Sequence, residues 1–296
     1  MATSYREVRV PRGNELRRVQ LRSRRLISGD LLGQYRSAFR GTGLVYTDIR
    51  EYQPGDDVKH IHWKATARTG TVFVKSYEEE RQLRVLLAVD ASASMRAPFS
   101  HYAFSKALEF SALVGALTQR GNDLLGLHLF AAQELGFLPP KSGAKRYHEV
   151  LSMLLSAASP ATAGSDLGAA VTRLSLTLKK PSIIFILSDF FVPPFEDHLK
   201  NLGLRHDVVL VQIQPILSGL PHAGLVSFVD AETGQQVTID SNSKKVRSSW
   251  QQIIDAQRAE LAEIAERCRV DHIVIRESAS EPLVRLMRTR ATRKVR

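Results

Sequence analysis

The spacing of apolar residues changes near residue 83, and it predicts different structures on the two sides of that point. From there onward, short apolar runs alternate with segments whose apolar residues recur at helical spacing. Strands alternating with helices indicate an α/β fold with a doubly wound, mostly parallel sheet. The expected strands cover residues 83–89, 123–130, 182–187, 207–213 and 271–275, and the expected helices cover residues 101–119, 147–158, 166–178, 195–202, 245–267 and 281–290.

The first 80 residues follow no single period. Residues 16–32 mix arginines with spaced apolar residues and predict a basic, partly amphipathic helix, and residues 44–52 and 71–77 alternate as strands do. We therefore expect three parts: a basic, β-rich appendage at residues 1–80, a sheet domain at 81–280 and a basic C-terminal helix or tail at 281–296. Within the sheet domain, we expect a β-hairpin insertion at 224–240.

Composition supports a folded domain and narrows its setting. Of the 296 residues, 44% are hydrophobic and 24% are charged, which excludes a disordered chain. The single cysteine, Cys268, cannot form an intrachain disulfide, so we expect a cytoplasmic protein. No apolar run approaches the roughly 18 residues that a membrane helix needs, so we expect no membrane span.

The net charge of +11 is concentrated at the two ends of the chain. Residues 1–88 hold 17 basic and 10 acidic residues, residues 89–284 hold 18 and 20, and the last twelve residues hold six basic and no acidic residues. The long middle is therefore slightly acidic. An excess of this kind favours an anionic partner for the ends: an acidic protein first, with anionic lipid or nucleic acid as the less favoured alternatives.

A group of oxygen-bearing side chains is expected at one edge of the sheet. Asp90, Ser92 and Ser94 follow the strand at 83–89 directly, and Asp189 follows the strand at 182–187. Ser165 precedes the helix at 166–178. Because ligands gather at the carboxyl ends of strands in doubly wound sheets, these residues predict a site for a hard cation, best suited to Mg²⁺, with Mn²⁺ or Ca²⁺ as alternatives.

Each of these residues also has a simpler interpretation. Ser165 or Asp166 could cap the helix that follows. Asp90 and Asp189 could be loop carboxylates that are hydrogen-bonded without a metal.

Asp90, Ser92, Ser94, Ser165 and Asp189 resemble, in order and spacing, the metal-ion-dependent adhesion site of von Willebrand factor A domains. In that family the hydroxyls bind the metal directly, the aspartates act mostly through water, and a carboxylate of the partner completes the shell. The resemblance implies that role for the three serines and the two aspartates here.

Two departures from the family pattern stand out. Ser165 replaces the usual threonine, which preserves the hydroxyl chemistry. Phe190 replaces the glycine that often follows the last aspartate, which is expected to affect the shape of that loop.

A second string of residues resembles the bacterial DUF58 family. The RxYxPGDD…W…AR pattern, followed by a Val-Lys-Ser-Tyr-Glu segment at 74–78, consists of Arg50, Tyr52, Gly55, Asp56, Asp57, His60, His62, Trp63 and Arg68. This resemblance implies an association with MoxR-type AAA+ ATPases, and with another von Willebrand A protein, in maturing or remodelling protein complexes. We expect the cluster to hold the N-terminal part to the sheet domain through charged hydrogen bonds. The alternative is a zinc site at His60 and His62.

The expected function is that of a metal-dependent protein-binding adaptor that acts with a MoxR-type AAA+ ATPase and captures an acidic residue of a protein ligand. The alternative is a basic protein that binds nucleic acid or an anionic surface. We expect no enzyme, because the chain has no GxxxxGK[ST], HExxH or GxSxG motif.

Overall fold

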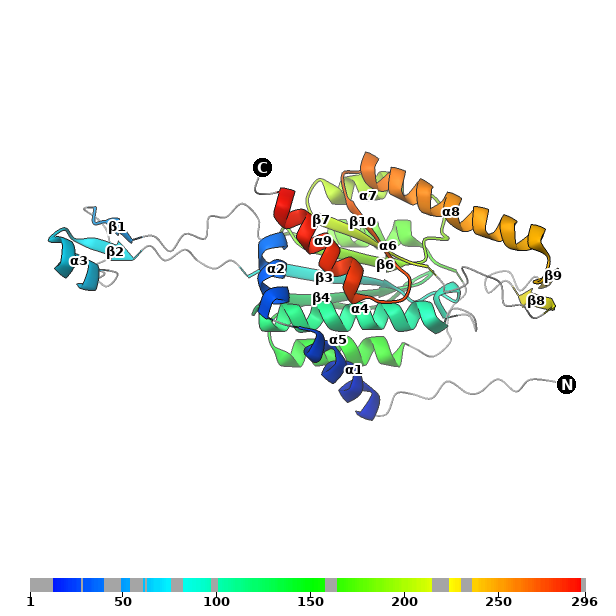
Figure 1. Ribbon diagram of the computed structural model, residues 1–296, viewed down its shortest axis with the longest axis horizontal. Coiled ribbons are helices and arrows are strands. Elements are labelled where there is room, and N and C mark those ends of the chain that lie inside the picture. Colours follow the sequence, from blue (N-terminus) through cyan, green and yellow to red (C-terminus); the bar gives the residue numbers. More distant parts are fainter. Residues whose placement is uncertain are drawn as a thin grey trace. The chain divides into compact units, whose positions relative to one another are not determined.

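The computed structural model describes residues 13–27, 29–39, 49–53, 61, 63–75, 82–96, 101–157, 164–214, 224–229 and 236–293. Contacts divide the chain into two compact units. The larger unit combines Met1–Phe39 with Leu83–Arg296, and the smaller unit is Arg40–Gln82. Figure 1 shows the helices and strands of both units.

A six-stranded sheet forms the centre of the larger unit, as the apolar runs predict (Figure 1). Its order is β10-β7-β6-β3-β4-β5, and every neighbouring pair is parallel except β4 and β5. The α/β, mostly parallel sheet is therefore confirmed. The strands are β3 (Arg84–Asp90), β4 (Leu124–Phe130), β5 (Glu134–Lys141), β6 (Ile183–Ser188), β7 (Asp207–Ile213) and β10 (Asp271–Ile275).

The strand order reverses between β3 and β6. Going outward from β3, the chain continues to β4 and β5 on one side, whereas β6, β7 and β10 follow in turn on the other side. A reversal of this kind leaves a crevice at the carboxyl ends of the two central strands, and this crevice is the usual ligand position in doubly wound sheets. The aspartates predicted as site residues follow these two strands.

Helices cover both faces of the sheet. Alternate residues of β3 point to opposite faces: Val85, Leu87 and Val89 join one buried cluster, while Leu86 and Ala88 join the other. The first cluster includes α4 (His101–Arg120) and α5 (Ala144–Ser156), and the second includes α6 (Leu167–Thr177), α7 (Glu196–Gly203) and α8 (Lys244–Arg267). Near-continuous apolar strands follow from burial on both faces.

Two short strands form the predicted hairpin. β8 (Leu225–Val229) pairs antiparallel with β9 (Gln236–Asp240) as a separate two-stranded sheet. By contrast, the sequence patterns did not predict β5. This strand contains Pro139 and Pro140 and is largely exposed, so it shows neither an apolar run nor a clean alternation. Prolines are tolerated there because β5 is an edge strand.

The N-terminal boundary differs from our prediction. Residues 1–80 do not form one appendage, because the described residues 13–39 belong to the larger unit. They form α1 (Gly13–Leu26), which packs on α4 and α5, and α2 (Gly29–Phe39), which packs on α4 and α9 (Ser280–Arg293). Burial explains the difference: Tyr35 is 1% exposed, and the Phe39 ring lies edge-on to Phe185 of β6 at 5.7 Å.

The predicted C-terminal helix forms as α9, and it is part of the larger unit. Arg290 of α9 pairs with Asp207 of β7 at 2.7 Å and with Asp271 of β10 at 2.6 Å. Its guanidinium also lies over the Phe39 ring, 4.8 Å from the centroid. Arg285 pairs with Glu281 at 2.9 Å. Part of the C-terminal positive charge is thus used inside the fold.

The smaller unit contains β1 (Ile49–Glu51), α3 (Trp63–Thr69) and β2 (Phe73–Lys75). β1 and β2 pair antiparallel, and the Phe73 amide donates to the Thr66 hydroxyl at 3.0 Å, which ties β2 to α3. The two strand patterns expected at 44–52 and 71–77 correspond to this pair.

Among the helices of the described residues, none has the length and hydropathy that crossing a bilayer would take.

Candidate functional site

Asp90 is the centre of the candidate site. It is the last residue of β3, the central strand of the sheet, and its side chain is fully buried. One carboxylate oxygen, Oδ1, accepts the Ser92 amide at 2.9 Å. The chain therefore turns sharply after the strand and stays close to the carboxylate. A buried carboxylate needs such donors, since an unsatisfied one costs several kcal/mol.

The other oxygen of Asp90 brings together two distant segments. Ser165 Oγ donates to Asp90 Oδ2 at 2.9 Å, and Ser188 Oγ donates to the same oxygen at 2.7 Å. Ser188 ends β6, and Ser165 lies in the loop before α6. The predicted residues at the ends of β3 and before α6 are thus in direct contact, and Ser188 joins them.

Of the two residues that could cap the helix α6, Asp166 is the one that does so. Asp166 is the N-cap of α6, and its Oδ1 accepts the Ala169 amide at 2.8 Å. Its backbone amide donates to the Ala131 carbonyl at 3.0 Å, just beyond β4. Asp166 therefore caps the helix, and the Ser165 hydroxyl is left to bond Asp90.

The two remaining serines lie next to each other on the turn after β3. Ser92 is fully buried, Ser94 begins the short 3₁₀ helix η2 (Ser94–Arg96), and their hydroxyl oxygens are 3.0 Å apart. The DxSxS spacing thus places both hydroxyls on the turn whose Ser92 amide bonds the Asp90 carboxylate.

Asp189 begins a tight turn after β6. It is 7% exposed, and its Oδ1 accepts the Phe191 amide at 3.1 Å. Phe190 has a φ of 59°, in the left-handed region that favours glycine. The residue that replaces glycine in the family pattern therefore adopts the conformation that glycine favours. Its amide donates to Ser188 Oγ at 3.0 Å, and its buried ring contacts Phe195 at 5.9 Å.

The donor set fits a hard divalent cation. Within the described residues, no three His, Cys, Asp or Glu side chains are grouped so that they could hold a metal ion, so any metal here depends on the serine hydroxyls. All the side-chain donors are oxygens, the ligands that Mg²⁺ prefers. A hydroxyl that donates its proton to Asp90 keeps its lone pairs for a cation. The five predicted residues could hold one, whereas the Ser188 hydroxyl both donates to Asp90 and accepts the Phe190 amide.

The DUF58-like cluster lies in the smaller unit, and much of it lies outside the described residues. Gly55, Asp56, Asp57, His60 and His62 are in that group, and for Arg50 only the backbone is described. Among the others, Trp63 is 67% exposed, Tyr52 is 37% exposed and Arg68 is exposed. The proposed anchoring role and the zinc alternative therefore both stay predictions.

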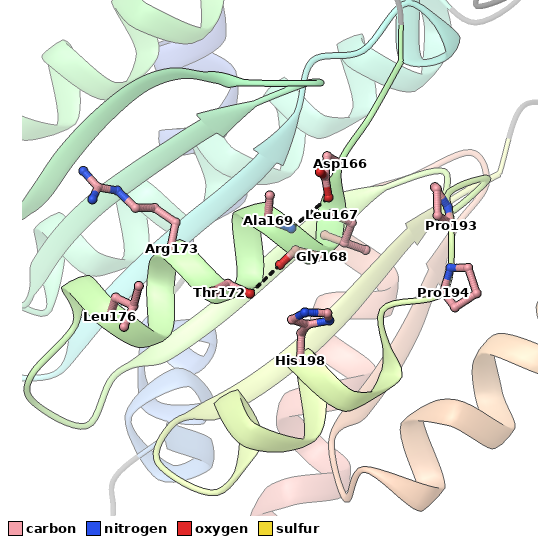
Figure 2. Close-up of a pocket in the computed structure, with 10 residues that line it drawn as sticks. All are labelled: Asp166, Leu167, Gly168, Ala169, Thr172, Arg173, Leu176, Pro193, Pro194 and His198. Atoms are coloured by element: carbon pink, nitrogen blue, oxygen red, sulfur yellow. Dashed lines mark hydrogen bonds between the residues drawn. The ribbon is translucent and has the colours of Figure 1, made fainter.

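A pocket of about 560 Å³ adjoins the candidate site (Figure 2). It begins at Asp166, the neighbour of Ser165, and extends along α6 to Leu176. Pro193, Pro194 and His198 line the facing side, as Figure 2 shows. The surface of this pocket is mostly apolar, and Asp166 is the lining residue that is next to the candidate site in the chain.

Sequence reasoning missed two residues of this region. Ser188 is not among the predicted site residues, although its place at the strand end beside Asp189 is a usable signal. Gln257 of α8 donates from Nε2 to the Asp189 carbonyl at 2.8 Å. Nothing in the sequence around Gln257 indicates this contact, because it depends on how α8 packs over the sheet.

Comparison with known proteins agrees with the resemblance to the DUF58 family. The model of the family described as "Protein of unknown function DUF58" matches residues 48–260. Uncharacterized proteins of Mycobacterium bovis and Mycobacterium tuberculosis are 28% identical to the chain over 261 residues, which is 86% of this chain and 81% of each relative.

Among solved structures, the chain is similar to the pilus adhesin SpaC from Lactobacillus rhamnosus GG in its open conformation. The TM-score is 0.41 and the sequence identity is 12%, over 73% of this chain. The chain spans 30% of the length of that adhesin.

Proposed function

The chain belongs to the DUF58 family, whose description names no activity, and we propose from the site itself that it is a metal-dependent protein-binding adaptor. One observation supports this most directly: side chains from two distant segments, Ser165 and Ser188, donate to the same oxygen of Asp90. A fully buried carboxylate at the switch point of the sheet, surrounded by hydroxyls, is an arrangement suited to a cation.

In this proposal Mg²⁺ supplies a positive charge with an open position for an acidic residue of the ligand. Ser92, Ser94 and Ser165 would bind the cation, and Asp90 and Asp189 would balance its charge, as the resemblance to von Willebrand factor A domains implies. The chain's own part is to orient the hydroxyls: Asp90 accepts the proton of Ser165, so the lone pairs of that hydroxyl face away from the carboxylate, and the Ser92 and Ser94 hydroxyls are held beside each other on the turn after β3. The adjoining pocket along α6 would receive residues that flank the acidic one.

The partner in this proposal is a MoxR-type AAA+ ATPase or its client protein, in the cytoplasm. No catalytic role is part of this proposal.

Metal binding is the first test. Isothermal titration with Mg²⁺ and Mn²⁺ should detect one site in the wild-type protein and none in the double variant Asp90→Ala, Ser92→Ala. Ser175→Ala is the matched control, because among the described residues the Ser175 hydroxyl bonds only the Val171 carbonyl within α6. Equal affinity in the wild type and the double variant would contradict the proposal.

Partner binding is the second test. Co-purification with the MoxR-type ATPase of the same genome should depend on Mg²⁺ and be lost with EDTA and in the double variant. Retention of the ATPase under both conditions would show that the site does not serve this interaction.

A second candidate function, binding of an anionic surface, is favoured by α1. Its exposed side includes four arginines: Arg17, Arg18, Arg22 and Arg25. Among the described residues none of them has an ion-pair partner, unlike Arg285 and Arg290 of α9. Leu21 is 54% exposed between them. An unpaired arginine stripe on a helix is typical of a surface that meets phosphates or carboxylates.

Replacement of the four α1 arginines by glutamine tests this alternative. Sedimentation with phosphatidylserine-containing vesicles and binding to duplex DNA, each at two salt concentrations, should be weaker in that variant than in Arg285→Gln. If the wild type binds neither probe at low salt, the alternative is excluded.

A further inference from the structure

A chain of side-chain hydrogen bonds connects the candidate site to the far edge of the sheet. Gln257 of α8 donates to the Asp189 carbonyl at 2.8 Å. Gln212 of β7 donates in turn to Gln257 Oε1 at 2.9 Å. His272 of β10 then lies with its Nε2 3.2 Å from Gln212 Oε1. Side chains from α8, β7 and β10 thus form a continuous series of hydrogen bonds that ends at the Asp189 carbonyl.

The chain of bonds has a single direction. Because Gln257 uses its amide nitrogen on Asp189, its oxygen is left to accept from Gln212. The oxygen of Gln212 then faces His272, which has to donate from Nε2. Every donor therefore points toward the Asp189 carbonyl. Gln212 is fully buried, so the loss of any one bond would leave a buried polar group without its partner.

The series of hydrogen bonds ends at the Asp189–Phe191 turn, whose backbone conformation is unfavourable by itself. Phe190, directly after Asp189, has a left-handed backbone that disfavours a side chain with a β carbon. Two hydrogen bonds within the turn stabilise it locally. The Phe190 amide donates to Ser188 Oγ, and the Phe191 amide donates to the Asp189 carboxylate. Gln257 adds an anchor from outside the turn, on the helix that covers this face of the sheet.

We propose that Gln257 is a positioning residue for the metal site: it fixes the Asp189–Phe191 turn, which is joined to Asp90 through the Ser188 hydroxyl. The metal part of this inference rests on the proposed function, whereas the fixing of the turn does not. Gln257 acts through the Asp189 backbone and is not itself a ligand. Residues that orient metal ligands in this way typically change metal affinity by 10- to 100-fold when they are replaced.

Two variants and one control test the role. Gln257→Met keeps the length of the side chain and removes both hydrogen bonds. Gln257→Glu keeps an acceptor for Gln212 but cannot donate to Asp189. Gln251→Met is the matched control, because Gln251 lies on the same helix and bonds only Asp255 among the described residues, at 2.9 Å.

The first readout is amide hydrogen exchange in the metal-free protein. The Phe190 and Phe191 amides should exchange at least about ten times faster in both Gln257 variants and at the wild-type rate in Gln251→Met. Unchanged exchange in the Gln257 variants would overturn the inference, whether or not the protein binds metal.

The second readout is Mn²⁺ affinity. We expect about a tenfold weaker affinity in both Gln257 variants and no change in the control. Faster exchange with unchanged affinity would show that Gln257 holds the turn without serving the metal site, which also overturns the positioning role. A wild-type protein that binds no Mn²⁺ would refute the proposed function instead, and the exchange result would still decide whether Gln257 holds the turn.

Discussion

Ser188 and Asp90 are 98 positions apart in the chain, and the hydroxyl of one donates to the carboxylate of the other at 2.7 Å. Both side chains are fully buried. The same hydroxyl oxygen accepts the Phe190 amide, so one serine joins the end of β3 to the turn after β6.

Replacing Ser188 by alanine is therefore expected to destabilise the protein. The change removes a donor from a buried carboxylate and an acceptor from a buried amide, which costs about 1–3 kcal/mol for each unsatisfied group. Urea unfolding measures the difference. Ser175→Ala on α6 should change the free energy of unfolding by no more than about 0.5 kcal/mol, and a similar small value for Ser188→Ala would contradict the assigned contacts.

Arg290→Lys is expected to lower stability even though it keeps the positive charge. The guanidinium forms two parallel bonds to Asp207 and a further bond to Asp271, a geometry that lysine cannot reproduce. Its side chain is 11% exposed, so the loss should reach about 1–3 kcal/mol by thermal or urea unfolding. The comparison is Arg285→Lys, at an ion pair more than 70% exposed on both sides, where an effect below about 0.5 kcal/mol is expected.

Acidification should destabilise the fold before the carboxylates titrate. Burial, with a contribution from Arg258, lowers the pKa of His272 to about 4 from an ordinary value of 6.5. Between these pH values the unfolded chain binds a proton at this position and the folded chain does not, so stability falls as the pH drops. Burial lowers the pKa of His128 and His206 in the same direction.

Urea unfolding at pH 7.5 and pH 5 measures this effect. His272→Gln, which can still donate to Gln212, should reduce the loss of stability by roughly 1–2 kcal/mol. An unchanged pH dependence would mean that His272 takes up its proton equally in the folded and unfolded chain.

Two glycine-to-alanine changes should have opposite effects. A β carbon at Gly126 of β4 would lie 2.8 Å from the Leu138 carbonyl oxygen and 3.0 Å from the Pro140 nitrogen, both backbone atoms. Gly126→Ala should therefore destabilise by about 1–3 kcal/mol. Gly33 lies in the exposed part of α2 with no atom within 4 Å of the added carbon, so Gly33→Ala should stabilise by about 0.5–1 kcal/mol. Unfolding midpoints of the two variants on the same side of the wild type would refute this contrast.

The central strands could be predicted from sequence because burial on both faces gives near-continuous apolar runs. The run at 182–187 corresponds to β6 within one residue at each end. That single residue matters, because Ser188 belongs to the strand and its hydroxyl is directed by the pairing with β7. The position of a side chain at a strand end depends on how that strand pairs with its neighbours. The local sequence pattern does not reveal this pairing.

Other features depend on contacts between distant segments. The helical pattern at residues 16–32 covers α1 and only the start of α2, whose remaining residues are helical because Leu31 and Tyr35 are buried against the rest of the larger unit. Similarly, the arginines of the last helix appeared as free positive charge, but Asp207 and Asp271 neutralise Arg290 only once β7 and β10 are side by side. Composition counts charges and cannot show which of them are paired.

The prolines of β5 also have a consequence for how molecules of this protein meet one another. An edge strand with free amides can template a strand from a second molecule, and this is a common route to aggregation. Pro139 and Pro140 each lack an amide donor, and the register of β5 against β4 is interrupted between Leu125 and Leu127, beside them. Prolines and an irregular register on an edge strand disfavour pairing with a strand of a second molecule, so β5 is a poor template for intermolecular growth of the sheet.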